Sequence, residues 1–153
     1  MSLDEPRISA VLDANLIVSG TIVRHGIPNR ILRAWLSDAF DLISSSFLTA
    51  EVADVLARPR IQERYRPDPR DVQLILDALA VAESQPIDLD DLPVHCRDAD
   101  DDPGLACALG GHAGYIVTGD KDLLDLDGHP ALGPLRIITA RAFFDILASR
   151  TQP

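Results

Sequence analysis

Short and almost wholly apolar runs alternate along this chain with longer segments whose apolar residues recur at helical spacing. Residues 8–12 predict a buried strand, and similar runs predict strands at 115–118 and 135–138, with a shorter candidate at 41–44. Helical spacing, bounded by capping residues, glycines or prolines, predicts helices over 27–40, 46–56, 68–83, 103–109 and 139–148. Strands that alternate with helices are typical of an α/β domain with a mostly parallel sheet.

The composition is that of an ordinary globular protein. With 153 residues, 46% of them hydrophobic, the chain is long enough to bury a core, and we expect one domain over residues 1–153. No run of about 18 apolar residues is present, so no membrane span is expected, and residues 1–7 do not resemble a secretory signal. Cys96 and Cys107 match no metal-binding or redox spacing, which favours reduced thiols in a cytoplasmic protein.

The charge balance argues against a simple electrostatic nucleic-acid binder, because the net charge is -10 and such binders are usually basic. It does not exclude an enzyme that acts on nucleic acid, since a bound cation can screen phosphates locally. Five arginines nevertheless lie close together in the sequence: Arg58, Arg60, Arg64, Arg66 and Arg70. They form either a solvated face or a set of contacts to phosphate.

Three aspartates occupy positions where an α/β sheet forms its sites. Asp13 follows the apolar run 8–12, and Asp120 follows the run 115–118. Asp102 ends an acidic cluster and opens the predicted helix 103–109. Ligands of such sheets bind outside the carboxyl ends of the strands. Each aspartate could also be an ordinary helix N-cap, with Pro103 then at the first helical position.

Glu51 gives a different signal, because it lies inside the apolar stripe of the predicted helix 46–56. With Leu48 at zero and about 100° per residue, Glu51 falls near 300°, between Phe47 near 260° and Val55 near 340°. A carboxylate on a buried face is costly unless it is paired or bound to a metal. An arginine partner is one interpretation, and a metal is the other.

Several ionised carboxylates cannot share a pocket unaided. One pair at about 4 Å repels by about 4 kcal/mol at an effective dielectric near 20, so either some protonate or a cation neutralises them. All-oxygen ligation favours Mg²⁺ or Mn²⁺. A calcium loop starting at Asp98 is excluded, since Pro103 and Leu109 stand where glycine and glutamate are needed. The serines lack a matching His–Asp arrangement, and the four scattered histidines are assigned no catalytic role.

The ordered set of motifs resembles the PIN-domain nucleases. The segment 8–19 (ISAVLDANLIVS) resembles their opening motif, and 96–102 (CRDADDD) with Leu105 and Ala106 resembles the third acidic motif. The segment 117–123 (VTGDKDL) is similar to the fourth motif, and 44–60, with Glu51 and VLARPR, is similar to the second acidic region. The closest resemblance is to the bacterial members described as toxins of toxin–antitoxin systems.

This resemblance implies a Rossmann-like three-layer α/β/α sandwich around a parallel sheet. It also implies Mg²⁺- or Mn²⁺-dependent cleavage of single-stranded or looped RNA, a homodimer and an antitoxin partner. The implied catalytic and metal-binding residues are Asp13, Glu51, Asp102 and Asp120. Accompanying polar residues are Asn15 and Thr118, with Asp122 as an auxiliary; the crowded third motif leaves Asp100 and Asp101 as candidates to share the role of Asp102. Arg58, Arg60 and Arg64 are the candidate RNA contacts.

Two other classes of function stay open. A receiver-type signalling domain also has an acidic Mg²⁺ pocket in an α/β fold, but it needs an acidic pair after the first strand, where this chain has Asp13 followed by Ala14. A catalytically idle domain that only binds RNA or protein is the other alternative, and the intact set of four carboxylates argues against it.

Overall fold

The structure, a computed structural model, describes residues 6–151 and contains a four-stranded sheet in the order β2-β1-β3-β4. The strands are β1 (Ser9–Leu12), β2 (Asp41–Leu42), β3 (Tyr115–Val117) and β4 (Arg136–Ile138). All three pairings are parallel, and β1 and β3 lie in register from Ala10 opposite Tyr115 to Leu12 opposite Val117. The predicted parallel sheet is therefore confirmed, and β1 and β3 end side by side.

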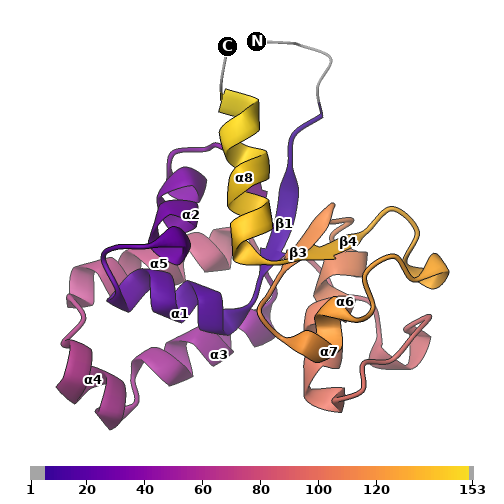
Figure 1. The fold of residues 1–153 in the computed structure, drawn as a ribbon. Coiled ribbons are helices and arrows are strands. Elements are labelled where there is room, and N and C mark those ends of the chain that lie inside the picture. Colours follow the sequence, from indigo (N-terminus) through magenta and orange to yellow (C-terminus); the bar gives the residue numbers. More distant parts are fainter. Residues whose placement is uncertain (1–5, 152–153) are drawn as a thin grey trace.

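Helices cover both faces of this sheet (Figure 1). The connection from β1 to β2 and the connection from β2 to β3 run in opposite directions across the sheet, and right-handed crossovers place their helices on opposite faces. Helix α2 packs against α8, whereas α6 packs against β1 and β3. The helices are α1 (Ala14–Ile22), α2 (Ile27–Leu36), α3 (Ser46–Leu56), α4 (Pro59–Tyr65), α5 (Pro69–Val81), α6 (Asp102–Gly110), α7 (Lys121–Leu124) and α8 (Ala140–Thr151). This confirms the predicted three-layer α/β/α fold.

The largest departures from the sequence-based prediction are three helices that it did not contain: α1, α4 and the short α7. Helix α1 is buried at most of its positions, so it lacks the alternation of polar and apolar faces by which an amphipathic helix is found. Helix α4 begins at Pro59, which was expected only to end the preceding helix and instead takes the first helical position of the next one. The predicted helix 27–40 ends earlier, at Leu36, and Asp38 follows with a positive φ of 65°.

The buried apolar side chains form a cluster that joins the sheet to both helical layers. Phe143 of α8 makes edge-to-face contacts with Phe40, at 5.0 Å between ring centroids, and with Tyr115 of β3, at 5.8 Å. Cys96 and Cys107 are free, buried thiols. Among residues 6–151, none of the helices combines the length and apolar character needed to cross a membrane.

Gly110 at the end of α6 is required by close packing. A Cβ built there would lie 2.2 Å from the carbonyl oxygen of Gln85 and 2.7 Å from the Cα of Pro86. We therefore expect Gly110→Ala to lower the free energy of unfolding by about 1–3 kcal/mol, because backbone must move to relieve the clash. Denaturant unfolding measures the change.

The matched control is Gly104→Ala in the same helix, where nothing lies within 4 Å of the added methyl group. It should be neutral or slightly stabilising, because alanine has the higher helix propensity. Equal stability of the two variants would contradict the packing of residues 85–87 against α6.

Candidate metal centre

The carboxyl ends of β1 and β3 are tied together by Thr118. Its buried hydroxyl donates to Asp13 Oδ2 at 2.7 Å, and the same Oγ1 accepts a hydrogen bond from the Asp120 N–H at 3.0 Å. The Asp13 N–H in turn donates to the carbonyl of Val117 at 2.9 Å. Residues separated by about a hundred positions in the sequence are thereby held at one edge of the sheet.

Asp13 and Asp120 are both helix N-caps, which was the alternative interpretation of their positions in the sequence. Asp13 Oδ1 accepts from the Asn15 N–H at 3.0 Å and caps α1, while Asp120 Oδ1 accepts from the Asp122 N–H at 2.8 Å and caps α7. Capping fixes the direction of each carboxylate. It leaves further lone pairs on each oxygen, so these carboxylates remain able to bind a cation.

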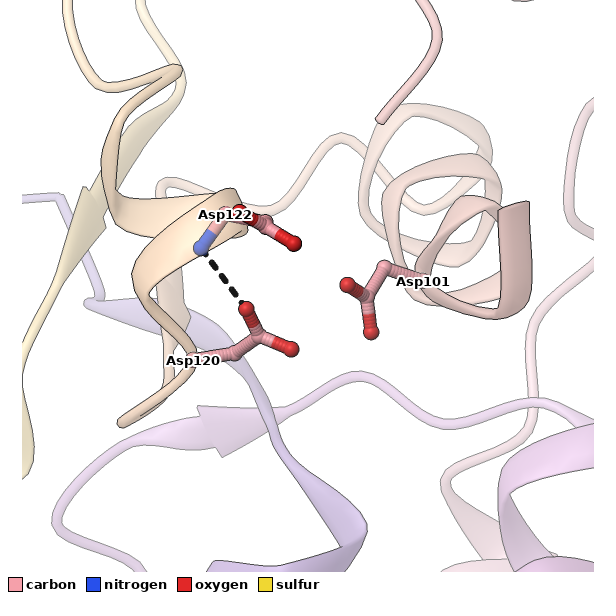
Figure 2. Close-up of side chains that lie close together, drawn as sticks. All are labelled: Asp101, Asp120 and Asp122. Carbon is pink, nitrogen blue, oxygen red and sulfur yellow. Dashed lines mark hydrogen bonds between the residues drawn. The ribbon is translucent and has the colours of Figure 1, made fainter. Parts of the chain in front are cut away.

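Three carboxylates converge where the first turns of α6 and α7 meet. Asp101, Asp120 and Asp122 each offer an oxygen within 4.8 Å of the others, and Figure 2 shows them facing a common space. Asp101 comes from the start of α6, and the other two come from the start of α7. Asp13 lies beside this group and lines the same cleft as Asp101.

Asp101 is the member of this group whose carboxyl group is least satisfied by the protein. Its Oδ2 is buried and has no hydrogen-bond partner among the described residues. Burial, the adjacent Asp120 carboxyl group and the charges of Asp98 and Asp13 raise the pKa of Asp101 to about 7. A group in this position either holds a proton or faces a cation. An all-oxygen set with an unsatisfied buried member fits a hard divalent ion.

Asp102, the expected member of the quartet, points away from this group. Its Oδ1 accepts from the Cys96 N–H at 2.7 Å, and its Oδ2 lies 2.9 Å from His95 Nδ1. Burial alone would raise the pKa of Asp102, but the hydrogen bonds from His95 and Cys96 outweigh it and lower this pKa. Helix α6 also begins one residue earlier than predicted, so Asp102 is its first residue and Asp101 takes the N-cap position. The structure therefore places Asp101 in the cleft in place of Asp102.

Glu51 faces the cleft from α3, but it is exposed, unlike its apolar neighbours Leu48 and Val52. The expectation that it lies on a wholly buried face is wrong, because the stripe containing it borders an open cleft. Partial burial and the charges of Asp13 and Asp100 raise the pKa of Glu51, and the charge of Arg58 opposes this rise. Glu51 thus lies within electrostatic reach of both the acidic site and the arginine-rich segment.

The remaining candidates lie at the margin of the site. Asp100 is exposed and lines the cleft, and Asn15 is exposed and contributes its backbone N–H to Asp13. Arg97, which the sequence did not single out, pairs with Asp122 at 3.3 Å. His95 was likewise missed as the partner of Asp102. Neither contact has a sequence signal, because both join a loop to side chains whose direction depends on the fold.

Asp13, Glu51, Asp100 and Asp101 line a cleft that also has apolar lining residues. Its volume is about 80 Å³, room for an ion with several waters at roughly 10–15 Å³ each. Leu12, Leu48, Ile116 and Leu123 contribute apolar surface to it. Low-dielectric walls of this kind strengthen the interaction of the carboxylates with a cation.

Comparison with known proteins agrees with this geometry. The family model described as the PIN domain, a family typically of nucleases that bind divalent metals, matches residues 9–122. The chain is also 28% identical over 124 residues to the uncharacterized protein MJ1680 of Methanocaldococcus jannaschii, covering 81% of this chain and 78% of that protein. No solved structure gives a significant match. The matched region contains the β1 and β3 strand ends and Asp101, Asp120 and Asp122, and the chain belongs to the PIN domain family.

Proposed function

We propose that this protein is a metal-dependent endoribonuclease that hydrolyses phosphodiester bonds of single-stranded or looped RNA. The observation that carries this function is the buried, unpartnered Oδ2 of Asp101 among the carboxylates of Asp120 and Asp122, at the sheet edge of a PIN domain. A cluster that repels itself in the absence of a cation is suited to bind one. Single strands are favoured because their backbone can enter a narrow cleft.

Asp101, Asp120 and Asp122, with Asp13 beside them, would hold Mg²⁺ or Mn²⁺. When bound, such an ion lowers the pKa of a water molecule and stabilises charge on the scissile phosphate. Thr118 fixes the direction of Asp13, and the capping bond from the Asp122 N–H fixes that of Asp120. Asp102 orients its neighbour Asp101 by anchoring the start of α6 to the loop at 95–96. Glu51, which is exposed and lines the cleft, would accept a proton from the attacking water.

The arginine-rich segment is the proposed contact surface for the RNA backbone. Helix α4 packs against α3, which carries Glu51, and the side chains of Arg60, Arg64 and Arg66 are exposed. The charge of Arg58 opposes the rise in the pKa of Glu51, although the Arg58 guanidinium also pairs with Asp54 at 3.3 Å. Phosphate contacts of this kind set the position of the strand without reading its sequence.

The toxin role and its partners are a finer part of the same proposal. Large apolar side chains are exposed on two helices where a protein partner could bind, namely Leu36 on α2 and Leu74 and Val81 on α5. They support a homodimer or a complex with an antitoxin. A small DNA-binding protein encoded next to this gene would support the toxin role, and light scattering of the purified chain would determine its oligomeric state.

Cleavage of RNA by the purified protein tests the enzymatic function. We expect a labelled, unstructured RNA to be cleaved in Mg²⁺ or Mn²⁺ and to stay intact in a chelator. Asp13→Asn should be inactive, because it removes charge at the site while still accepting the Asn15 capping bond. If the wild type is no more active than Asp13→Asn with several RNAs and both metals, the protein is not a nuclease.

A further inference from the structure

The acidic cleft contains one large apolar side chain that packing does not explain. Phe47, in the first turn of α3, is 55% exposed, although its neighbour Leu48 is buried. Its side chain lines the cleft together with Glu51, Asp100 and Asp101. A single exposed phenylalanine elsewhere on the surface would need no explanation. Here it lines the cleft in which the RNA backbone is proposed to bind.

Phe47 shares the cleft with two residues from the start of α6. Pro103 and Gly104 also line it, and nothing outside its own helix and chain neighbours lies within 4 Å of a Cβ built at Gly104. The cleft therefore has two kinds of surface: carboxylates that bind a cation, and apolar walls beside them. A nucleotide has the matching division, with an anionic phosphate and a planar base that stacks on aromatic rings.

The spacing along α3 agrees with this division. Phe47 and Glu51 are four residues apart, so their side chains lie on the same face of the helix, with Cβ atoms about 5–6 Å apart. A nucleotide whose phosphate lies beside Glu51 and the metal-binding carboxylates would thus have its base within reach of the Phe47 ring.

Resting on the proposed nuclease function, we propose that Phe47 is the stacking platform for an unpaired base adjacent to the scissile phosphate. This residue then determines the substrate class. A base in a duplex already stacks on its neighbours and cannot turn onto Phe47, so the enzyme requires single-stranded RNA at the site of cleavage. Stacking accepts every base, so Phe47 selects unpaired RNA without selecting its sequence.

The test measures binding of an unstructured, fluorescein-labelled RNA in Mn²⁺, with every variant made in the Asp13→Asn background, which is expected to be inactive and keeps Asp101, Asp120 and Asp122. Phe47→Ala should weaken binding by about 5-fold to 100-fold, the range expected when one stacked base is lost. Phe47→Trp should restore binding, whereas Phe47→Leu, which is apolar but not aromatic, should not. The matched control is Leu89→Ala, which removes another exposed apolar side chain away from the cleft and should have no effect.

A second set of RNAs separates stacking from a general effect on the cleft. In this set, a single abasic nucleotide occupies each position of the oligonucleotide in turn. At one position it should weaken binding to the protein that keeps Phe47, but not to the Phe47→Ala variant. Cleavage by the corresponding variants with an intact Asp13 should show a raised KM for Phe47→Ala. Equal binding of Phe47→Ala and Leu89→Ala overturns the role of Phe47 while the nuclease function stands. The same holds if Phe47→Ala loses as much affinity for abasic RNA as for intact RNA. A wild type that neither binds nor cleaves RNA overturns both.

Discussion

Asp101→Asn should lower kcat/KM for metal-dependent RNA cleavage by at least about 100-fold, whereas Asp102→Asn should remain within about tenfold of the wild type. Asp101 carries the buried oxygen that has no partner and faces Asp120 and Asp122. Its loss removes a charge that holds the metal, and metal stabilisation of the transition state amounts to several kcal/mol. Initial rates with a labelled single-stranded RNA at saturating Mn²⁺ measure both variants.

Asp102→Asn is the matched control, because both of its oxygens are already used by the protein. An asparagine oxygen can still accept from the Cys96 N–H, and its amide can donate to the neutral ring of His95. Asp102→Ala, by contrast, leaves the buried Cys96 N–H without a partner and should cost about 1–3 kcal/mol of stability. The assignment of Asp101 is contradicted if Asp102→Asn is folded and inactive while Asp101→Asn cleaves normally.

Divalent metal should raise the melting temperature of the wild type by roughly 5–10 °C at about 100 times the dissociation constant. The effect should be larger at pH 8 than at pH 5, because the metal binds the ionised carboxylates. Asp101→Asn should show a much smaller shift. Thermal melts with Mn²⁺, and with a chelator as the reference, measure the difference. Equal shifts for the two proteins would mean that Asp101 does not contribute to the metal site.

In chelator, the melting temperature of the protein should depend on pH. The sign of this dependence follows from the pKa of Asp101. Its pKa is about 7 in the folded protein, against an ordinary value of 3.8. Between these values the folded state holds a proton that the unfolded state has released, so the stability of the metal-free protein falls as pH rises through this window. The raised pKa of Glu51 acts in the same direction. Asp101→Asn should therefore lose part of this pH dependence, and an unchanged slope would contradict the pKa of Asp101.

Much of the site could be predicted because strand ends are visible in the sequence. Asp13 and Asp120 each follow an apolar run, and adjacent parallel strands bring the two ends to one edge. The resemblance of the motifs to PIN-domain nucleases agrees with the family match. Asp100, Asp101 and Asp122 were named as auxiliary candidates. Asp101 and Asp122 lie in the converging group, because they are close to the starts of α6 and α7.

The sequence by itself therefore determined the order of the four strands and of five of the eight helices, the sheet edge that carries the candidate site and the kind of chemistry that its carboxylates favour. Only the tertiary structure decided which aspartate of the crowded motif enters the cleft. Neighbouring residues on a helix point about 100° apart, so a shift of one residue in the start of α6 exchanges Asp101 for Asp102. That shift depends on hydrogen bonds to His95 and Cys96, which local periodicity does not encode. The exposure of Phe47 and Glu51 has the same origin, because a helical pattern records which residues share a face but not whether that face meets the core or an open cleft.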